Sequence, residues 1–271
     1  MASTTSDSSP GAGRWRAAQR GLTALLLRDL RGLRRLINPS RLQATVPPWI
    51  EEVNALVVQY AEVSATLAAD FYDGERETAE VPGTFTVPLA DPPPEEQTEA
   101  SLRWATKDVW DRDPDMATTV QLEPLDVRIE AAMSKADGVT QKLVADVGRE
   151  TVRQAVREDR EAVAYARVAA LGACSFCKLM ASRGAVYRTA GTAGRDANDL
   201  FSGEASVVKF HNNCHCGIVP VFRGQQFQLS PHAARWDEIY REYAQGHPGD
   251  QLRLFRRALA EHDEHPLPGS H

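Results

Sequence analysis

The sequence predicts a mainly α-helical fold that contains a helical hairpin, further helices and a small α+β segment near the C-terminus. Apolar residues recur every three or four positions over long stretches, which is typical of helices that bury one face. This period is lost over residues 171–228, and all 4 cysteines of the chain lie in that stretch. A chain of 271 residues, of which 42% are hydrophobic and 25% charged, has the composition of one or two globular domains.

The first predicted unit is a helical hairpin at residues 14–72, which follows a small, polar segment at residues 1–13 that we expect to be disordered. The first helix is expected to end before Pro39, because the residue preceding a proline is pushed out of the helical region. The second helix is expected to begin after Pro48. The apolar stripe that predicts the first helix consists of Leu22, Leu26, Leu30, Leu33 and Ile37.

Composition and the spacing of apolar residues also divide the rest of the chain into segments. Residues 73–97 contain five prolines and many acids, which predicts a linker or a surface excursion. Residues 98–170 are expected to be helical, with a candidate break at Asp137-Gly138, and residues 229–271 are expected to form closing helices and a polar tail. We find no secretory signal and no apolar run long enough to span a bilayer, so we expect a protein kept in a reducing cytosol.

Charge is distributed unevenly along the first hundred residues. Residues 11–45 contain eight arginines and one acid, a local net charge of +7, whereas residues 46–100 contain twelve acids and one arginine. An arginine-rich helix of this kind is suited to bind nucleic-acid phosphates or an acidic protein surface. Alternatively, the basic first arm of the hairpin faces its acidic second arm. The candidate contact residues are Arg14, Arg16, Arg20, Arg28, Arg31, Arg34 and Arg35.

The cysteines fall into two tight groups, which is the pattern of a metal site. Cys174 and Cys177 form a C-x-x-C pair, and His211, Cys214 and Cys216 follow after a segment of 33 residues. Each pair can fold into a knuckle that directs both ligands at one ion, with backbone N–H groups on the sulfurs. In a reducing cytosol such clusters indicate a metal rather than disulfides, and a thiolate-rich tetrahedral site favours zinc.

Two ligand sets remain open for this zinc site. One set uses all four cysteines, and the other uses His211 with Cys214 as the second pair and leaves Cys216 as a supporting or exchanged ligand. A site with four protein ligands has no open position for water, so a structural role that staples the α+β segment is favoured over catalysis. A redox C-x-x-C site is disfavoured, because the stretch before Cys174 is expected to be helical.

The sequence contains no motif of a zinc metalloprotease, a serine hydrolase or a nucleotide-binding loop. Ser182, Ser202 and Ser206 lie around the metal segment, and a Ser/His pair with His211 is conceivable. Nothing supplies an acid partner or an oxyanion hole for such a pair. We therefore assign no catalytic residue and favour a protein that is not an enzyme, with a protease as the alternative.

The segments RVAALGACSFCKLMASRGAVYRTAGTAG and FHNNCHCGIVPVF resemble the C-terminal part of MuF-like minor capsid, or head morphogenesis, proteins of tailed phages, especially phages of actinobacterial hosts. An RTE-like helix that is typical of the wider family is echoed by Arg149-Glu150-Thr151. The resemblance is carried by Cys174-x-x-Cys177, Arg183-Gly184-x-x-Tyr187 and His211-x-x-Cys214-x-Cys216 leading to Pro220.

This resemblance implies a low-copy structural protein that joins the procapsid near the portal. Its implied partners are the portal and the major capsid or scaffold protein, with DNA inside the head as a further contact, and we expect no membrane and no small-molecule substrate. The implied location is the capsid interior of the virion and, during assembly, the host cytoplasm. Genes of this type are also described as capsid maturation proteases, which gives the first alternative function. A nucleic-acid-binding zinc module is the second.

Overall fold

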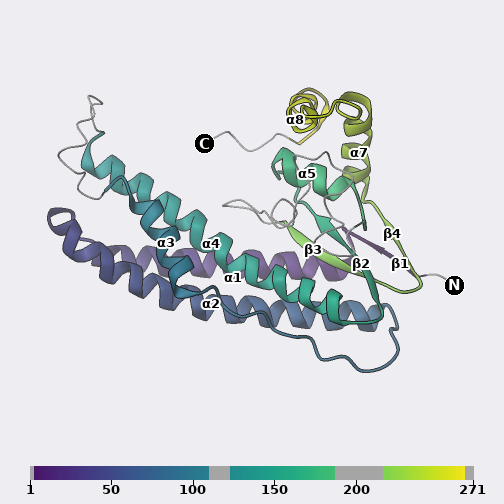
Figure 1. The fold of residues 1–271 in the computed structure, drawn as a ribbon, viewed down its shortest axis with the longest axis horizontal. Coiled ribbons are helices and arrows are strands. Elements are labelled where there is room, and N and C mark those ends of the chain that lie inside the picture. The colour runs from purple at the N-terminus through teal and green to yellow at the C-terminus, as the bar shows by residue number, and fades with distance from the viewer. Residues whose placement is uncertain (1–2, 110–122, 187–215, 266–271) are drawn as a thin grey trace.

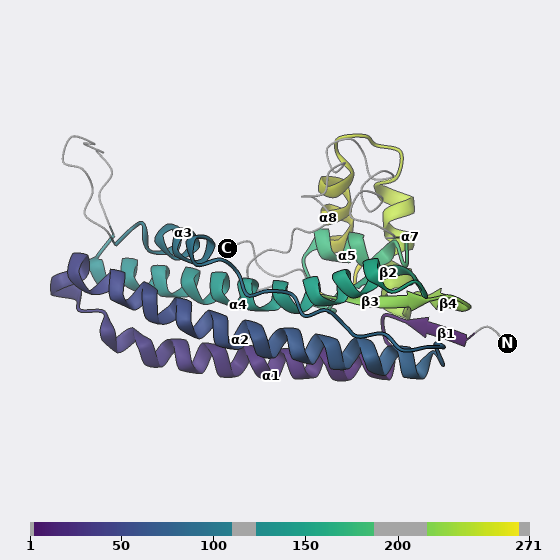
Figure 2. The same ribbon diagram turned by 60° about the horizontal axis from the view of Figure 1, so that its bottom comes forward.

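The computed structural model describes residues 3–109, 123–186 and 216–265, which form an elongated helical bundle joined to a smaller α+β end (Figure 1). Helices α1, α2 and α4 run lengthwise beside one another, and α3 packs on α2 and α4 (Figure 2). The prediction of a mainly helical protein with a small sheet is therefore confirmed. The bundle contains α1 (Pro10–Leu33), α2 (Leu42–Thr78), α3 (Glu95–Thr106) and α4 (Leu125–Glu158).

The α+β end is built on two pairs of strands. The strand β2 (Ala162–Val168) pairs antiparallel with β3 (Gly217–Phe222), and β1 (Ser3–Ser6) pairs parallel with β4 (Gln225–Gln228). The pairing of β1 with β4 joins the N-terminal segment to the last part of the chain (Figure 1). Helix α5 (Ser175–Ser182) packs on β2, and α7 (Pro231–Tyr243) and α8 (Gln251–His262) pack on α5 and on each other.

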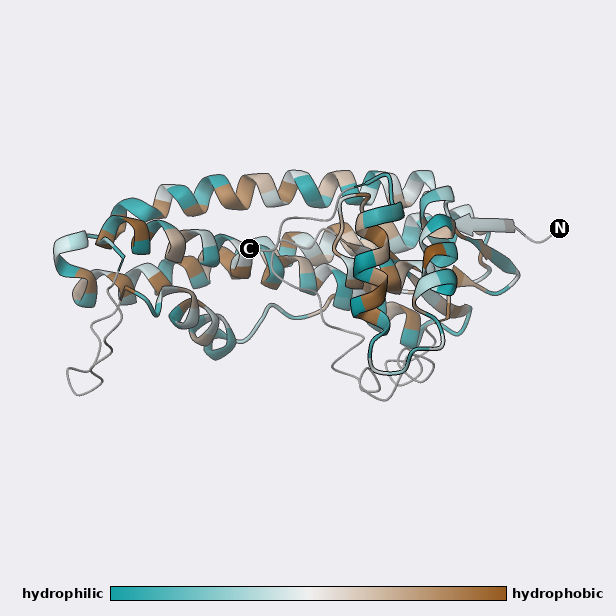
Figure 3. Ribbon diagram, turned by 90° about the horizontal axis from the view of Figure 1, so that it is seen from above, coloured by the Kyte–Doolittle hydropathy of each residue, from teal (hydrophilic) through white to brown (hydrophobic). Residues whose placement is uncertain are grey.

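Apolar packing holds both ends of the molecule. In the bundle, Leu26 and Trp49 are completely buried, and Figure 3 shows apolar positions recurring along each bundle helix between hydrophilic ones. A second core packs the strands and helices of the α+β end around Trp236. Trp15 of α1 stacks on Phe71 of α2 with ring centroids 4.7 Å apart, and both belong to this second core. The hairpin and the α+β end therefore share their packing. No helix in the described ranges combines the length and the apolarity that crossing a membrane requires.

The N-terminal segment is ordered from β1 onward, contrary to the prediction of disorder over residues 1–13. Asp7 is 1% exposed, and its carboxylate accepts hydrogen bonds of 2.6 Å from the backbone N–H and from the hydroxyl of Ser230. Ser9 then caps α1 by accepting a backbone N–H of the first turn. The partner of Asp7 lies 223 positions away, so no local pattern could reveal that this polar segment is fixed.

Two features inside the helices also differ from the prediction. Helix α2 begins at Leu42, so Pro47 and Pro48 lie within it rather than before it. The two prolines lack the N–H groups that would bond to the carbonyls four residues earlier. These carbonyls lie close to the helix start and belong to solvent-exposed residues. Helix α4 passes through Asp137-Gly138 without a break, because its packing on α2 and α3 outweighs the roughly 1 kcal/mol that glycine costs in a helix.

The predicted helical stretch up to residue 170 ends at Glu158 and is followed by β2 instead. The run AVAYARV is rich in small and β-branched residues that fit either period, and pairing with the distant strand β3 decides for the strand. The segment between α2 and α3, predicted as a linker or excursion, lies against the bundle. Its Ala90 N–H donates to the Thr151 hydroxyl at 3.1 Å.

Candidate functional site

The register of β2 and β3 brings the two halves of the cysteine motif towards each other. Val168, the last residue of β2, pairs with Gly217, the first residue of β3. Cys216, the residue before β3, therefore lies beside the end of β2. Along the chain, the end of β2 comes only a few residues before Cys174, where α5 begins. Cys177 and Cys216 belong to the same apolar core, and Cys174 packs against it. We call Cys174, Cys177 and Cys216 the cysteine corner.

Cys174 is the N-cap of α5. Its Sγ accepts the backbone N–H of Cys177 at 3.4 Å, and Cys177 is almost completely buried. An N–H···S hydrogen bond and the positive end of a helix both stabilise a thiolate, which is the form of cysteine that binds zinc. The C-x-x-C pair thus forms a turn that places an N–H donor and a helix N-terminus at the sulfur of the first cysteine.

The second half of the cysteine corner is attached to α4. The backbone carbonyl of Cys216 accepts a hydrogen bond of 2.8 Å from Nε of Arg149, and Nη1 of Arg149 binds Asp146 at 2.7 Å. Arg149 is 4% exposed and its hydrogen bond to the Cys216 carbonyl is shielded from water, whereas Asp146 is partly exposed. Thr151, two residues further on, holds the segment before α3. The Arg149-Glu150-Thr151 run therefore connects α4 to two separate parts of the chain.

The donor chemistry of the cysteine corner fits zinc, since three soft thiols come from two adjacent elements. Within the described ranges, however, no group of three or more His, Cys, Asp or Glu side chains is placed to hold a metal ion. The other predicted ligands, His211 and Cys214, lie outside the described residues. A four-ligand zinc site therefore requires a side chain from this second group.

The prediction of a helix before Cys174, on which redox chemistry at the C-x-x-C pair is disfavoured, is wrong. The sequence predicts a helix before Cys174, whereas the strand β2 precedes it and Cys174 stands at the start of a helix. A cysteine of low pKa at a helix start is the feature that redox C-x-x-C sites share. Redox chemistry is thus an alternative to zinc at this position.

The serine candidates receive no support from the described part of the chain. Ser182 is buried at the end of α5, and its hydroxyl donates to the Leu179 carbonyl at 3.0 Å. This geometry ends a helix and leaves no exposed nucleophile. Ser202 and Ser206 lie outside the described residues, as does His211.

Ser230, His232 and Asp7 form a Ser-His-Asp grouping that acts as a helix cap. The Ser230 hydroxyl donates directly to Asp7 at 2.6 Å, and a single His232 nitrogen, Nε2, lies 3.0 Å from Ser230 and 3.6 Å from Asp7. In a hydrolytic triad the histidine bridges the serine and the acid with its two different nitrogens. Here the Ser230 oxygen also accepts the Ala233 N–H at the start of α7. The grouping therefore fixes β1 to α7 rather than activating a nucleophile.

The arginines of α1 and the turn after it lie mostly in solvent. Arg28 pairs with Asp29 of its own helix at 2.9 Å, and Arg34 binds Glu130 of α4 at 2.5 Å. Among the described residues no ion pair joins these arginines to an acid of α2, so direct pairing does not neutralise the basic face. The exposed members are Arg14, Arg20, Arg28, Arg31, Arg34 and Arg35, and Arg16 is half-buried.

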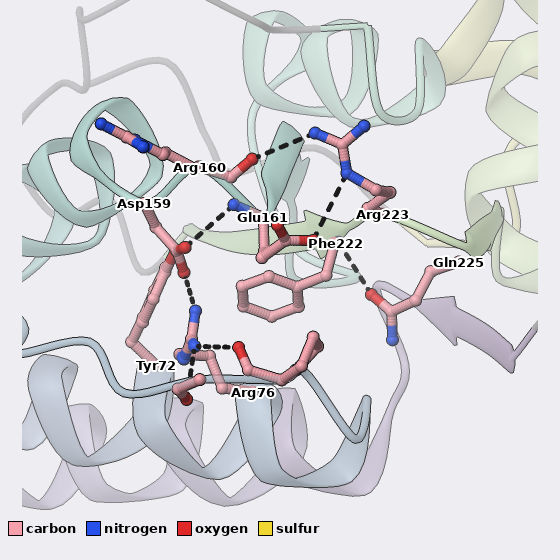
Figure 4. Close-up of polar contacts among 10 residues, drawn as sticks. Tyr72, Arg76, Asp159, Arg160, Glu161, Phe222, Arg223 and Gln225 are labelled. Atoms are coloured by element: carbon pink, nitrogen blue, oxygen red, sulfur yellow. Dashed lines mark hydrogen bonds and ion pairs between the residues drawn. The ribbon is translucent and has the colours of Figure 1, made fainter.

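Sequence reasoning missed two buried ion pairs that hold the fold. Arg76 at the end of α2 binds Asp159 at the end of α4, and the Tyr72 hydroxyl donates to the same carboxylate at 3.0 Å (Figure 4). Burial, and then the charge of Asp159, raise the pKa of the Tyr72 hydroxyl. Lys178 of α5 is fully buried and binds Asp263 at 2.5 Å. The isolated position of Arg76 among acids was a signal for the first pair, but nothing local marks the second.

A comparison with protein families gives a match over most of the chain. The family model described as VG15 protein matches residues 7–244, from the residues before α1 to the end of α7. No curated protein and no solved structure matches the chain.

Proposed function

The chain belongs to the VG15 protein family, a family of viral gene products, and from this premise we propose that it is a structural and assembly protein of a tailed-phage head. In this proposal it acts as a minor capsid, or head morphogenesis, protein near the portal. The observation that carries the proposal is the extent of the family match, because residues 7–244 include both the helical bundle and the cysteine segment. The resemblance to MuF-like proteins implies this same combination.

The architecture suits a protein that acts through contacts rather than through catalysis. Helix α2 has 37 residues and is therefore about 55 Å long, so the bundle can reach between neighbouring subunits. The basic face of α1 and the exposed acids of α2 give the bundle surfaces of opposite sign. The proposed partners are the portal and the major capsid or scaffold protein, with DNA as a further ligand of the basic face.

Zinc is proposed to connect Cys174 and Cys177 to the second cysteine group. Cys214 and Cys216 complete the set in one version, and His211 with Cys214 completes it in the other. Either site would fix the end of β2, the start of α5 and the start of β3 as one unit. Its role would be structural, because four protein ligands leave no coordination position for water.

The composition of assembled heads tests the proposal. A tagged full-length chain produced during infection is expected to copurify with the portal and to remain in purified heads at a low, constant copy number measured by mass spectrometry. The variant with Arg28, Arg31 and Arg35 changed to Gln removes exposed charge without touching the core. Reduced incorporation of this variant at unchanged stability would assign the basic face to assembly. Heads that assemble and fill with DNA normally without the chain would refute the proposal.

A dithiol redox protein is the second candidate, and one observation favours it. Cys174 follows a strand and caps a helix, which is the arrangement that lowers the pKa of a redox-active thiol. The protease alternative has a separate test. Autocleavage, or cleavage of a capsid protein, that is lost in Ser206→Ala or His211→Ala while zinc is retained would support it.

A further inference from the structure

A small cavity lies where α1, α4 and the start of β3 meet, next to the cysteine corner. Its volume is about 30 Å³, and its walls include Trp15, Arg16 and Arg20 from α1 and Gln141 and Arg149 from α4. We infer that this cavity is a binding site for a single oxyanion of the phosphate type. The inference goes beyond the proposed function and does not depend on it.

The charge of the cavity wall is positive. Three guanidinium groups line it, and no acid is among its described lining residues. Arg16 uses Nε for a 3.4 Å hydrogen bond to the Ala12 carbonyl, which leaves its terminal nitrogens for a ligand. Among the described residues, neither Arg16 nor Arg20 takes part in an ion pair. Arg149 is partly neutralised by Asp146, so the net charge at the wall stays positive. Uncompensated arginines around one small space favour an anion there.

Trp15 supplies a second, independent observation. Its side chain is almost completely buried, and its indole N–H has no hydrogen-bond partner among the described residues. Buried donors without an acceptor are rare in folded proteins and call for an explanation, such as a bound ion. The ring is held against the backbone of Gly217, where an added Cβ would lie 2.3 Å from Cζ3. Trp15 lines the cavity with its indole, so we count an anion bound there as the acceptor proposed for this N–H.

The size of the cavity narrows the ligand class. A volume of about 30 Å³ accommodates two or so water-sized groups. Two oxygens of one tetrahedral anion fill this space while the others lie towards solvent beside the exposed Arg20, whereas a whole nucleotide does not fit inside. Guanidinium groups bind phosphate oxygens through paired hydrogen bonds, and the Gln141 amide adds a neutral donor. Because Arg20 is exposed, the bound group is either free phosphate or a phosphate carried on a larger molecule outside.

Calorimetric titration of the full chain with inorganic phosphate at constant, low ionic strength tests the inference. Arg16→Gln and Arg20→Gln are each expected to weaken phosphate binding about tenfold, from the loss of a charge-assisted hydrogen bond. Trp15→Phe keeps an aromatic ring and removes the donor, and should weaken binding roughly threefold to tenfold. The matched control is Arg35→Gln, which removes the same charge from an exposed site outside the cavity and should leave the affinity within about twofold.

Equal weakening in Arg20→Gln and Arg35→Gln would overturn the inference, because it would show diffuse attraction to the basic face. Absence of phosphate binding at tens of millimolar, or tighter binding of acetate than of phosphate, would also overturn it. A short DNA duplex that displaces phosphate from the wild type would support the site with nucleic acid as the phosphate source. Saturable phosphate binding that the duplex does not displace would support it with free phosphate. These readouts need no heads, so failure of the proposed function would leave them unaffected.

Discussion

Nε of Arg149 donates a hydrogen bond of 2.8 Å to the backbone carbonyl of Cys216. This bond connects the long helix α4 to the residue before β3, so the stability of the bundle and the position of the cysteine segment are linked. A buried carbonyl needs a donor, and a planar guanidinium can serve this carbonyl and Asp146 at the same time. Arg149 is therefore a positioning residue for the second half of the cysteine motif.

Replacement of Arg149 by lysine is expected to lower the free energy of unfolding by about 1–3 kcal/mol, because one ammonium group cannot make both contacts. Urea denaturation followed by circular dichroism measures the change. The control is Arg157→Lys on the same helix, where an exposed guanidinium pairs with the partly exposed Glu150 and the loss should stay below about 1 kcal/mol. Equal losses in the two variants would contradict the special role of Arg149.

Asp159→Asn is expected to destabilise the protein by about 3–5 kcal/mol, because it leaves the buried charge of Arg76 without a counter-ion. The variant preserves the size of the side chain, so a loss of this magnitude reflects charge rather than packing. The comparison is Glu99→Gln, which removes an exposed partner of Arg103 on α3 and should cost less than about 0.5 kcal/mol. Thermal unfolding that shifts equally in the two variants would contradict the importance of the buried pair.

Two glycines in helices are expected to respond to alanine with opposite signs. A Cβ on Gly148 would lie 2.7 Å from Oγ and 3.1 Å from the carbonyl of Ser64, where α4 approaches α2. Gly148→Ala should therefore cost about 1–3 kcal/mol. A Cβ on Gly21 would meet nothing within 4 Å, so Gly21→Ala should gain up to about 1 kcal/mol from helix propensity. Stabilisation by both substitutions in chemical denaturation would show that the two helices are not in close contact.

Acid is expected to destabilise the protein through His232. Burial lowers the pKa of this imidazole below its ordinary value of 6.5, while Asp7 opposes the shift. Below about pH 6.5 the unfolded chain binds a proton on His232 that the folded chain does not. Protonation therefore favours the unfolded chain, and the free energy of unfolding decreases as the pH falls. His232→Gln should therefore lose less stability than the wild type between about pH 7.5 and 5.5. Parallel stability curves for the two proteins would contradict this assignment.

The sequence allowed the helical elements to be predicted where the apolar period was strong and their ends only where a local signal existed. The stripe at Leu22, Leu26 and Leu30 is the buried face of α1. In contrast, the run AVAYARV forms strand β2 because it pairs with Gly217–Phe222. The seven residues of the run do not themselves indicate this distant partner. Contacts with distant residues likewise explain why the N-terminal segment is ordered.

The candidate site was predictable in composition but not in arrangement. The spacing of Cys174 and Cys177 indicates a tight turn, and the structure has a helix cap with an N–H···S bond there. The attachment of Cys216 to Arg149 and the cavity beside Trp15 arise from helix packing, which leaves no mark on spacing. The sequence reveals which residues have reactive or metal-binding side chains, whereas packing between distant segments determines where those side chains lie.

Elemental analysis of protein purified without added metal tests the nature of the cysteine corner. We expect one zinc per chain, lost in Cys174→Ser and retained in Ser175→Ala, which alters the same turn without removing a thiol. The second pair distinguishes the ligand sets. Loss of zinc in Cys216→Ser with retention in His211→Ala indicates the four-cysteine site, and the reverse indicates the set that contains histidine.

Removal of the metal by a chelator should lower the melting temperature, because metal binding is coupled to folding. A metal-free wild type whose Cys174 is alkylated with a pKa well below the usual value of about 8.5 would instead establish a redox thiol, because the N-terminus of α5 would then be stabilising a thiolate without a metal.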